Sequence, residues 1–225
     1  LEKPLYLKEN FVNDNLNISF SIILVPAGGI INNEITKNIL PTKDSINRVV
    51  DYSFKFMLPE SFFNKRTKED WIIIHQWHDD PPLGTKWKDY NEKTRPPVAL
   101  WLLCTPDGKY TLYYSYGLFS KSIKERQRYR YKEYLRPNVW YNFQSTIKWS
   151  MDSLAGFSKV KVNDKYLVNE NGSLSKNIRG RNMFNPMPNY YKMGLYGNKE
   201  ENDSIYIYFD NFKFRKVYIF EFSEI

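Results

Sequence analysis

Apolar and polar residues alternate with a period of two along most of this chain. Such alternation is typical of β-strands, because successive side chains of a strand point to opposite faces. The segments with this pattern are 17–25, 49–58, 71–78, 98–104, 109–117, 126–135, 139–149, 157–164, 190–197 and 204–220. We find no long amphipathic helical pattern, so the alternation predicts an all-β protein.

About ten strands separated by turns predict an antiparallel sandwich or barrel. The clearest turn is TPDG at residues 105–108, which predicts a hairpin between 98–104 and 109–117. No Gly/Ser-rich or Pro-rich linker divides the 225 residues, so we expect a single domain spanning 1–225.

The chain carries a formal net charge of +8. A basic surface suits an anionic partner such as nucleic acid, a membrane surface or an acidic polysaccharide, although surplus lysine can also serve solubility alone. No run of about 18 apolar residues could span a membrane. The first residue is Leu1 rather than Met, which suggests a processed or trimmed N-terminus.

The single cysteine, Cys104, lies in the apolar run VALWLLC. One cysteine excludes an internal disulfide and a CxxC zinc site. We therefore expect Cys104 to be a small buried hydrophobic residue.

Both histidines lie in the segment WIIIHQWHDD, residues 71–80. Residues two apart in a strand share a face, so Gln76 and His78 are predicted to share one face with Ile72 and Ile74. This segment could be a metal site, a catalytic strand or the end of a core strand.

His75 and Trp77 are predicted to point to the opposite face from His78. Two histidines on opposite faces cannot share a metal ion, and a third clear ligand is missing. The alternative for a histidine in such an apolar run is a buried, hydrogen-bonded core residue.

The segment YYKMGLYG, residues 190–197, has a polar face and an apolar face. The polar face carries Tyr190, Lys192, Gly194 and Tyr196. A glycine inside a strand often marks the close approach of a ligand or of another backbone. The alternative is an ordinary solvated face.

A basic stripe is formed by Arg126, Arg128, Arg130 and Lys132, which alternate with Gln and Tyr. On a strand this stripe would suit carboxylates or sulfates. It could equally be a solvated edge strand that is protected by its charge.

The segments QWH, residues 76–78, and YYKMGLY, residues 190–196, resemble the paired Q-x-H and Y-x-K-x-G-x-Y signatures of jelly-roll alginate lyases. Four further segments are similar to the heparin lyase I-like group of polysaccharide lyases: 52–59, 139–150, 159–164 and 205–214. The resemblance extends from about residue 30 to residue 214. It implies a concanavalin-like β-jelly-roll sandwich of two antiparallel sheets.

The resemblance also implies a polysaccharide lyase that cleaves a uronic-acid-containing anionic glycan by β-elimination, without any required cofactor. Tyr196 would be the base, the acid or both. His78 would be the base or would neutralise charge, depending on the stereochemistry of the substrate. Gln76 would bind the carboxylate, and Lys192 would neutralise it and hold the sugar. The substrate-binding set would be Arg126, Arg128, Arg130, Tyr190, Glu34, Asn32 and Arg48.

One position departs from the pattern of these lyases, which carry R-x-E on an early strand. Here the segment is NNEI, residues 32–35, so Glu34 is present but Asn32 occupies the position of the arginine. Either Arg48 or the basic stripe substitutes for that arginine, or the substrate differs, or activity is lost.

Asp210, in the segment YFDNF, is a candidate calcium ligand, because sandwiches of this class often bind a structural calcium through an Asp on the last strand. Oxygen ligands suit Ca²⁺. The alternative is a turn or a cross-strand pair.

Three other functions compete with a lyase. A non-catalytic, lectin-like carbohydrate-binding module would tolerate the loss of Tyr196 or His78. A glycoside hydrolase needs two carboxylates flanking the bond, and the adjacent Glu69 and Asp70 would face oppositely on a strand. Nucleic-acid binding lacks a recognition motif. We therefore expect an anionic polysaccharide as the partner, no nucleic acid and no membrane, with a monomeric chain in a secreted or periplasmic location.

Overall fold

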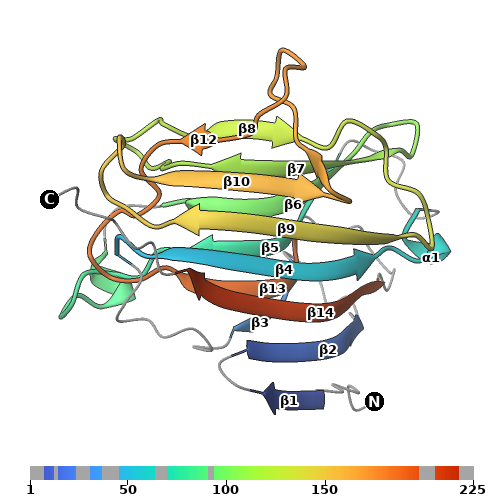
Figure 1. Cartoon of the computed structure of the whole chain (residues 1–225), viewed down its shortest axis with the longest axis horizontal. Helices are drawn as coiled ribbons and strands as arrows, with labels where there is room; N and C mark the ends of the chain where they lie inside the picture. The colour runs from blue at the N-terminus through green and yellow to red at the C-terminus, as the bar shows by residue number, and fades with distance from the viewer. Residues whose placement is uncertain are drawn as a thin grey trace, which may run out of the picture.

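Two antiparallel β-sheets make up almost all of the computed structural model (Figure 1). It describes residues 8–12, 15–23, 31–36, 46–63, 70–90, 94–197 and 206–217, and for residues 8–36 and 216–217 it describes the backbone alone. Every strand pair in these ranges is antiparallel. The predicted sandwich of two antiparallel sheets is confirmed.

The eight-stranded sheet is drawn in front in Figure 1. Its strands, in spatial order, are β1 (Lys8–Val12), β2 (Asn15–Ile23), β14 (Tyr206–Val217), β4 (Val49–Met57), β9 (Trp140–Lys148), β10 (Phe157–Val162) and β11 (Lys165–Tyr166), with β12 (Ile178–Arg179) also paired to β10. The six-stranded sheet has the order β3 (Ile31–Thr36), β13 (Tyr190–Gly197), β5 (Asp70–His78), β6 (Val98–Cys104), β7 (Tyr110–Tyr116) and β8 (Gln127–Arg130).

Helical structure in the described ranges is limited to α1 (Glu60–Phe63) and the 3₁₀ turn η2 (Trp87–Asp89). The period-two pattern explains this, because it cannot place an apolar stripe along one side of a helix. None of the helices in the described part of the chain is long and apolar enough to cross a membrane.

Strand β4 shows how the alternation builds the core. Its inward residues include Phe54 and Phe56, both fully buried, while Lys55 between them is exposed. The Phe54 ring lies 4.8 Å from the ring of Phe143 on β9, and Phe56 stacks on Tyr141 at 5.4 Å. Burial of each such ring contributes roughly 1.5–3 kcal/mol, so the inner faces of the strands hold the two sheets together.

The hairpin at residues 105–108 is confirmed. The Gly108 N–H donates to the Thr105 carbonyl at 2.9 Å, and Gly108 has a φ of +77°, which glycine tolerates best. Cys104 pairs with Tyr110 across the hairpin and is buried, as expected.

The prediction that Ile72 and Ile74 share a face with Gln76 is wrong. A β-bulge interrupts the pairing of β5 with β6 between Ile73 and His75. A bulge places two residues opposite one and shifts the alternation beyond it. Ile72 and Ile74 therefore pack in the core, and Ile73 lies on the same face as Gln76.

The basic stripe is shorter than predicted. Strand β8 ends at Arg130, which pairs with Tyr113 of β7 and also exchanges backbone hydrogen bonds with Val168, and Lys132 lies beyond the strand. Tyr129 and Tyr131 are buried in the core, so the alternation of this segment was interpreted correctly up to Arg130.

His75 is fully buried, as the core interpretation of this histidine predicted, but it is not hydrogen-bonded. Neither ring nitrogen has a hydrogen-bond partner. The imidazole lies between aromatic rings, 4.0 Å from Trp77 and 4.6 Å from Tyr191 by ring centroids. Burial lowers the pKa of His75 well below its ordinary value, so the ring is neutral in the folded protein.

We expect the buried His75 to make folding stability depend on pH. Below a pH of about 6.5 the unfolded chain binds a proton at His75 that the folded chain excludes, so stability falls as pH falls. The contribution lost between pH 7.5 and 5.5 should be about 1.4 kcal/mol. Urea unfolding at both pH values should show this loss in the wild type and not in His75→Phe. An equal loss in both proteins would contradict the assignment.

Candidate active site

A groove of about 570 Å³ runs over the outer face of the six-stranded sheet. It is lined by all four residues for which the resemblance implies catalytic roles: Gln76, His78, Lys192 and Tyr196. Strands β5 and β13 are neighbours, so segments more than 110 positions apart in the sequence supply one continuous polar surface. These four residues are thus brought together.

The strand register arranges these side chains in rows across the sheet. Gln76 lies opposite Lys192 and forms the central row. His78 lies opposite Tyr190 on one side of this row, and Tyr196 lies opposite Ile73 on the other side. His78 and Tyr196 therefore flank the Gln76–Lys192 row from opposite directions.

Gly194 leaves a gap on this face between Lys192 and Tyr196. It lies where the pairing of β13 with β5 shifts, and its φ of +146° strains any residue with a Cβ. Lys192 and Tyr196 are four residues apart, which is about 13 Å along a strand.

Aromatic rings border both ends of this polar surface. The His78 ring stacks on Tyr190 at 5.6 Å between centroids, and the Trp87 ring lies 5.9 Å from His78 and 6.3 Å from Tyr190. At the other end, Trp71 lies 5.9 Å from Tyr196. Flat rings of this kind offer apolar faces on which a sugar ring can rest.

Asp79 holds the His78 ring in one orientation. Its Oδ1 lies 2.9 Å from His78 Nδ1, and it also accepts hydrogen bonds from Thr94 Oγ1 at 2.7 Å and from Tyr90 OH at 3.0 Å. Asp79 is 1% exposed. A carboxylate at Nδ1 favours the tautomer that carries its proton there, which leaves Nε2 with a lone pair that can accept a proton.

Sequence reasoning missed Asp79. The available signal was the acidic residue directly after His78, but the alternation ends there and gives no direction for its side chain. Its partners Tyr90 and Thr94 lie in the segment after β5, which returns to the strand only in the folded protein.

Three arginines give the groove a strong positive charge: Arg95, Arg126 and Arg128. Burial, followed by repulsion from Arg95 and Arg128, lowers the pKa of Arg126 to about 10. Among the lining residues that the structure describes, none is Asp or Glu. The groove is therefore suited to an anion that supplies the missing negative charge.

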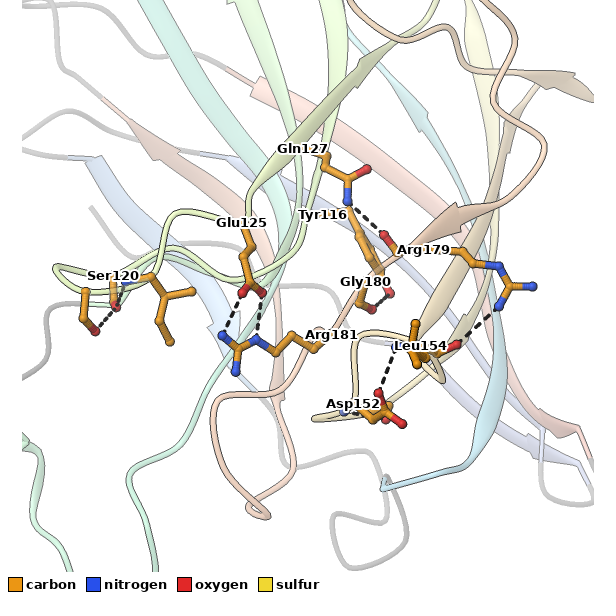
Figure 2. A network of polar contacts seen from close by, with 12 residues as sticks. Tyr116, Ser120, Glu125, Gln127, Asp152, Leu154, Arg179, Gly180 and Arg181 are labelled. Atoms are coloured by element: carbon orange, nitrogen blue, oxygen red, sulfur yellow. Dashed lines mark hydrogen bonds and ion pairs between the residues drawn. The ribbon is translucent and has the colours of Figure 1, made fainter.

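The backbone on both sides of Arg126 is anchored by a polar network (Figure 2). Glu125 accepts two hydrogen bonds from Arg181, at 2.7 and 2.8 Å, and this contact lowers the pKa of Glu125. Gln127 donates to the Arg179 carbonyl at 2.9 Å. Both contacts join the start of β8 to the segment at β12, so Arg126 is held at the groove between two fixed neighbours.

Other predicted binding residues lie elsewhere. Arg130 stands opposite Tyr113 on β7, donates to the Lys132 carbonyl and does not line the groove. Arg48 is exposed just before β4, in the other sheet, and also does not line it. The suggestion that Arg48 replaces the arginine missing at Asn32 therefore has no support from its position.

Asn32 and Glu34 lie on the backbone of β3, beside the predicted site. Asn32 is opposite Tyr196 and Glu34 is opposite Gly194. Their side chains are outside the described part of the structure. The strand register nevertheless places Asn32, which occupies the position of the arginine in the lyase pattern, directly next to Tyr196.

Asp210 lies in β14, where the pairing with β4 shifts after Lys55, and it accepts a hydrogen bond from the Asn211 N–H at 2.8 Å. In the described residues, no group of three or more His, Cys, Asp or Glu side chains is gathered at any point. This surrounding fits poorly with Ca²⁺, which takes about six to eight oxygen ligands. Calcium at Asp210 stays a prediction.

Comparison with solved structures finds similar two-sheet folds in known enzymes. The endo-β-1,4-glucuronan lyase from the fungus Trichoderma reesei is similar with a TM-score of 0.57 and 15% identity, over 95% of this chain and 87% of that chain. The alginate lyase AlyC3 gives 0.54 and 13%, over 88% and 75% of the two chains. A search of curated proteins found no match.

The fold is shared beyond lyases. The catalytic domain of a glycoside hydrolase family 131 protein from Coprinopsis cinerea has a TM-score of 0.50 and 11% identity, over 91% of this chain and 71% of that chain. At such identities, likeness in structure shows the fold alone, and fold does not determine reaction.

The sequence match is more specific than the structural likeness. The family model described as polysaccharide lyase matches residues 29–213, which include both signature segments and the arginines of the groove. It does not distinguish the heparin lyase I-like group, so that narrower resemblance stays a prediction. On this match over most of its length, the chain belongs to the polysaccharide lyase family and is a lyase enzyme.

Proposed function

We propose that this lyase cleaves a polymer of 1,4-linked uronic acids by β-elimination. The observation that carries the proposal is the groove, which combines Gln76, His78, Lys192 and Tyr196 with three arginines, and in which no described lining residue is acidic. The charge favours a polyanion, and the four other groups supply proton transfer and carboxylate recognition.

The reaction needs three tasks. A base removes the proton from carbon 5, and the electrons of that C–H bond form the double bond between carbons 4 and 5. The bond from carbon 4 to the bridging oxygen breaks, and an acid protonates the departing oxygen. Neutralising the neighbouring carboxylate makes the carbon-5 proton acidic, and preorganised donors that stabilise the resulting anion often contribute the largest effect.

The rows of the sheet suggest which residues perform each task. A sugar over the central row would have its carboxylate at Gln76 and Lys192, where an amide and an ammonium group can share its charge. Tyr196 and His78 would then face it from opposite sides, one as base and the other as acid. Asp79 supports this role by leaving His78 Nε2 able to take a proton.

The basic stripe supplies the charge that Asn32 lacks. Arg126 and Arg128 line the groove, together with Arg95, which the sequence pattern did not single out. Their presence beside all four proposed reacting groups favours a lyase over a non-catalytic binding module. A hydrolase is disfavoured because it needs two carboxylates flanking the bond, and the described lining of this groove offers none.

The names of two similar structures narrow the substrate class. One is a glucuronan lyase and the other an alginate lyase, and both polymers consist of uronic acids. We extend this class to the present chain, acting as a monomer in a secreted or periplasmic location where such polymers occur.

An ultraviolet absorbance assay for the unsaturated product tests the proposal. The panel is glucuronan, alginate, pectate, hyaluronan, chondroitin, heparin and heparan sulfate, each with and without added Ca²⁺. We expect a rise in absorbance on a non-sulfated polyuronate. New reducing ends without absorbance would indicate hydrolysis, and binding without cleavage would indicate a carbohydrate-binding module; either would overturn the proposal.

A further inference from the structure

A second groove of about 630 Å³ lies on the outer face of the eight-stranded sheet, on the side of the sandwich away from the candidate active site. It crosses β14, β4, β9 and β10, which lie side by side in Figure 1. The proposed lyase reaction uses none of its residues.

The register builds this groove from two parallel rows, each with a cation at both ends. The first row is Arg215, Asp51, Thr146 and Lys159. The second row is Lys213, Ser53, Gln144 and Lys161. Two cations on β14 thus face two cations on β10 across a floor made of Asp51 and three neutral polar side chains.

The charge of this groove is unbalanced. Asp51 is the one carboxylate among its described lining residues. It pairs with Arg215 at 2.8 Å and accepts a hydrogen bond from Thr146 Oγ1 at 2.7 Å, so its negative charge is neutralised within the first row. Lys159 and Lys161 on β10, and Lys213 on β14, are left to attract an anion.

The dimensions suit an extended polymer better than a single small anion. The cations on β14 and the cations on β10 are three strand spacings apart, about 14 Å. The two cations on each strand are about 7 Å apart. The floor presents Gln144, Ser53 and Thr146, whose amide and hydroxyl groups can hydrogen-bond to sugar hydroxyls. Tyr166 lies at the β10 end, with Lys161 4.9 Å above its ring.

We propose that this groove is a second, non-catalytic binding site for an anionic polysaccharide, the same polymer that the enzyme cleaves. The inference rests on the proposed function for the identity of that polymer. The amide and hydroxyl groups of the floor favour a polyhydroxylated chain over a duplex nucleic acid, which is bound chiefly through its phosphates. A second site would keep a long polymer near the enzyme between cleavage events and raise its effective concentration at the active site.

The test removes the two cations on β10 and leaves the active site intact. The variant is Lys159→Gln with Lys161→Gln, and the matched control is Lys121→Gln with Lys176→Gln, two exposed lysines outside both grooves. On the cleaved polymer the first variant should raise KM about five- to tenfold, with kcat unchanged. On oligosaccharides too short to reach both grooves it should match the wild type, and the control should match it on both substrates.

Binding is measured separately from cleavage, in a Tyr196→Phe background, by calorimetric titration with glucuronan and alginate. Two binding events per chain are expected, and Lys159→Gln with Lys161→Gln should remove one of them. One event in both proteins, or tighter binding of a short DNA duplex than of either polyuronate in the second groove, would overturn the inference. If no polymer is cleaved but the variant still loses a binding event, the proposed function fails and the second site stands.

Discussion

Replacing Tyr196 with Phe should lower kcat about 10²–10⁴-fold, the usual contribution of a positioned proton donor or acceptor. The substitution removes one oxygen and keeps the ring that packs 5.9 Å from Trp71, so KM should change little. The measurement is the initial rate of absorbance increase on the polymer that the wild type cleaves, with circular dichroism to verify folding.

Tyr190→Phe is the matched control for this experiment. Tyr190 lies on the same face of β13 and stacks on His78, but it stands at the far side of the Gln76–Lys192 row. Its loss should affect binding more than kcat. If Tyr190→Phe abolished activity and Tyr196→Phe did not, the phenol beside His78 would be the reacting group, and our assignment of that role to Tyr196 would be wrong.

Asp79→Asn should lower kcat about 10–100-fold with a small change in KM, the range seen when a residue that orients a metal-bound histidine is replaced. A carboxylate only accepts hydrogen bonds, whereas an amide also donates them through its NH₂ group. The amide therefore cannot serve purely as an acceptor for His78, Tyr90 and Thr94. The expected spectroscopic signature is a shift of the His78 tautomer away from Nδ1–H, measured from imidazole ¹⁵N chemical shifts.

Tyr90→Phe and Thr94→Val separate this positioning role from a purely structural one. Each removes one hydrogen bond to Asp79 and leaves its contact with His78 in place. We expect both to keep kcat within about threefold of the wild type, as for loss of an ordinary hydrogen bond. A loss as large as that of Asp79→Asn would mean that Asp79 serves mainly to hold the segment that follows β5.

The longer central strands and the four candidate catalytic residues of the groove were accessible from the sequence. Strand β13 spans 190–197, as the alternation predicted, and its face carries Tyr190, Lys192 and Tyr196 as expected. Short-range pattern suffices here because the pleat of a strand sets the direction of each side chain from its neighbours alone.

The same reasoning failed where a strand departs from regular pleating. The bulge beside Ile74 reversed the faces assigned to Ile72 and Ile74, and the end of β8 removed Lys132 from the stripe. A bulge depends on how two strands pair, and the energy that favours it lies in contacts with the partner strand. Nothing in the segment 71–78 taken alone carries that information.

The groove itself is a product of strand pairing. Gln76 and Lys192 were recognisable in separate motifs, and the alternation placed Gln76 on one face with His78 and Lys192 on one face with Tyr196, because both properties are local. Their contact with the groove that Arg95 and Arg126 also line depends on segments far apart in the sequence. The orientation of His78 by Asp79 likewise depends on Tyr90 and Thr94, which hold the Asp79 carboxylate. Such long-range contacts form only when the whole sandwich closes, because the burial of the shared core stabilises every pairing at once.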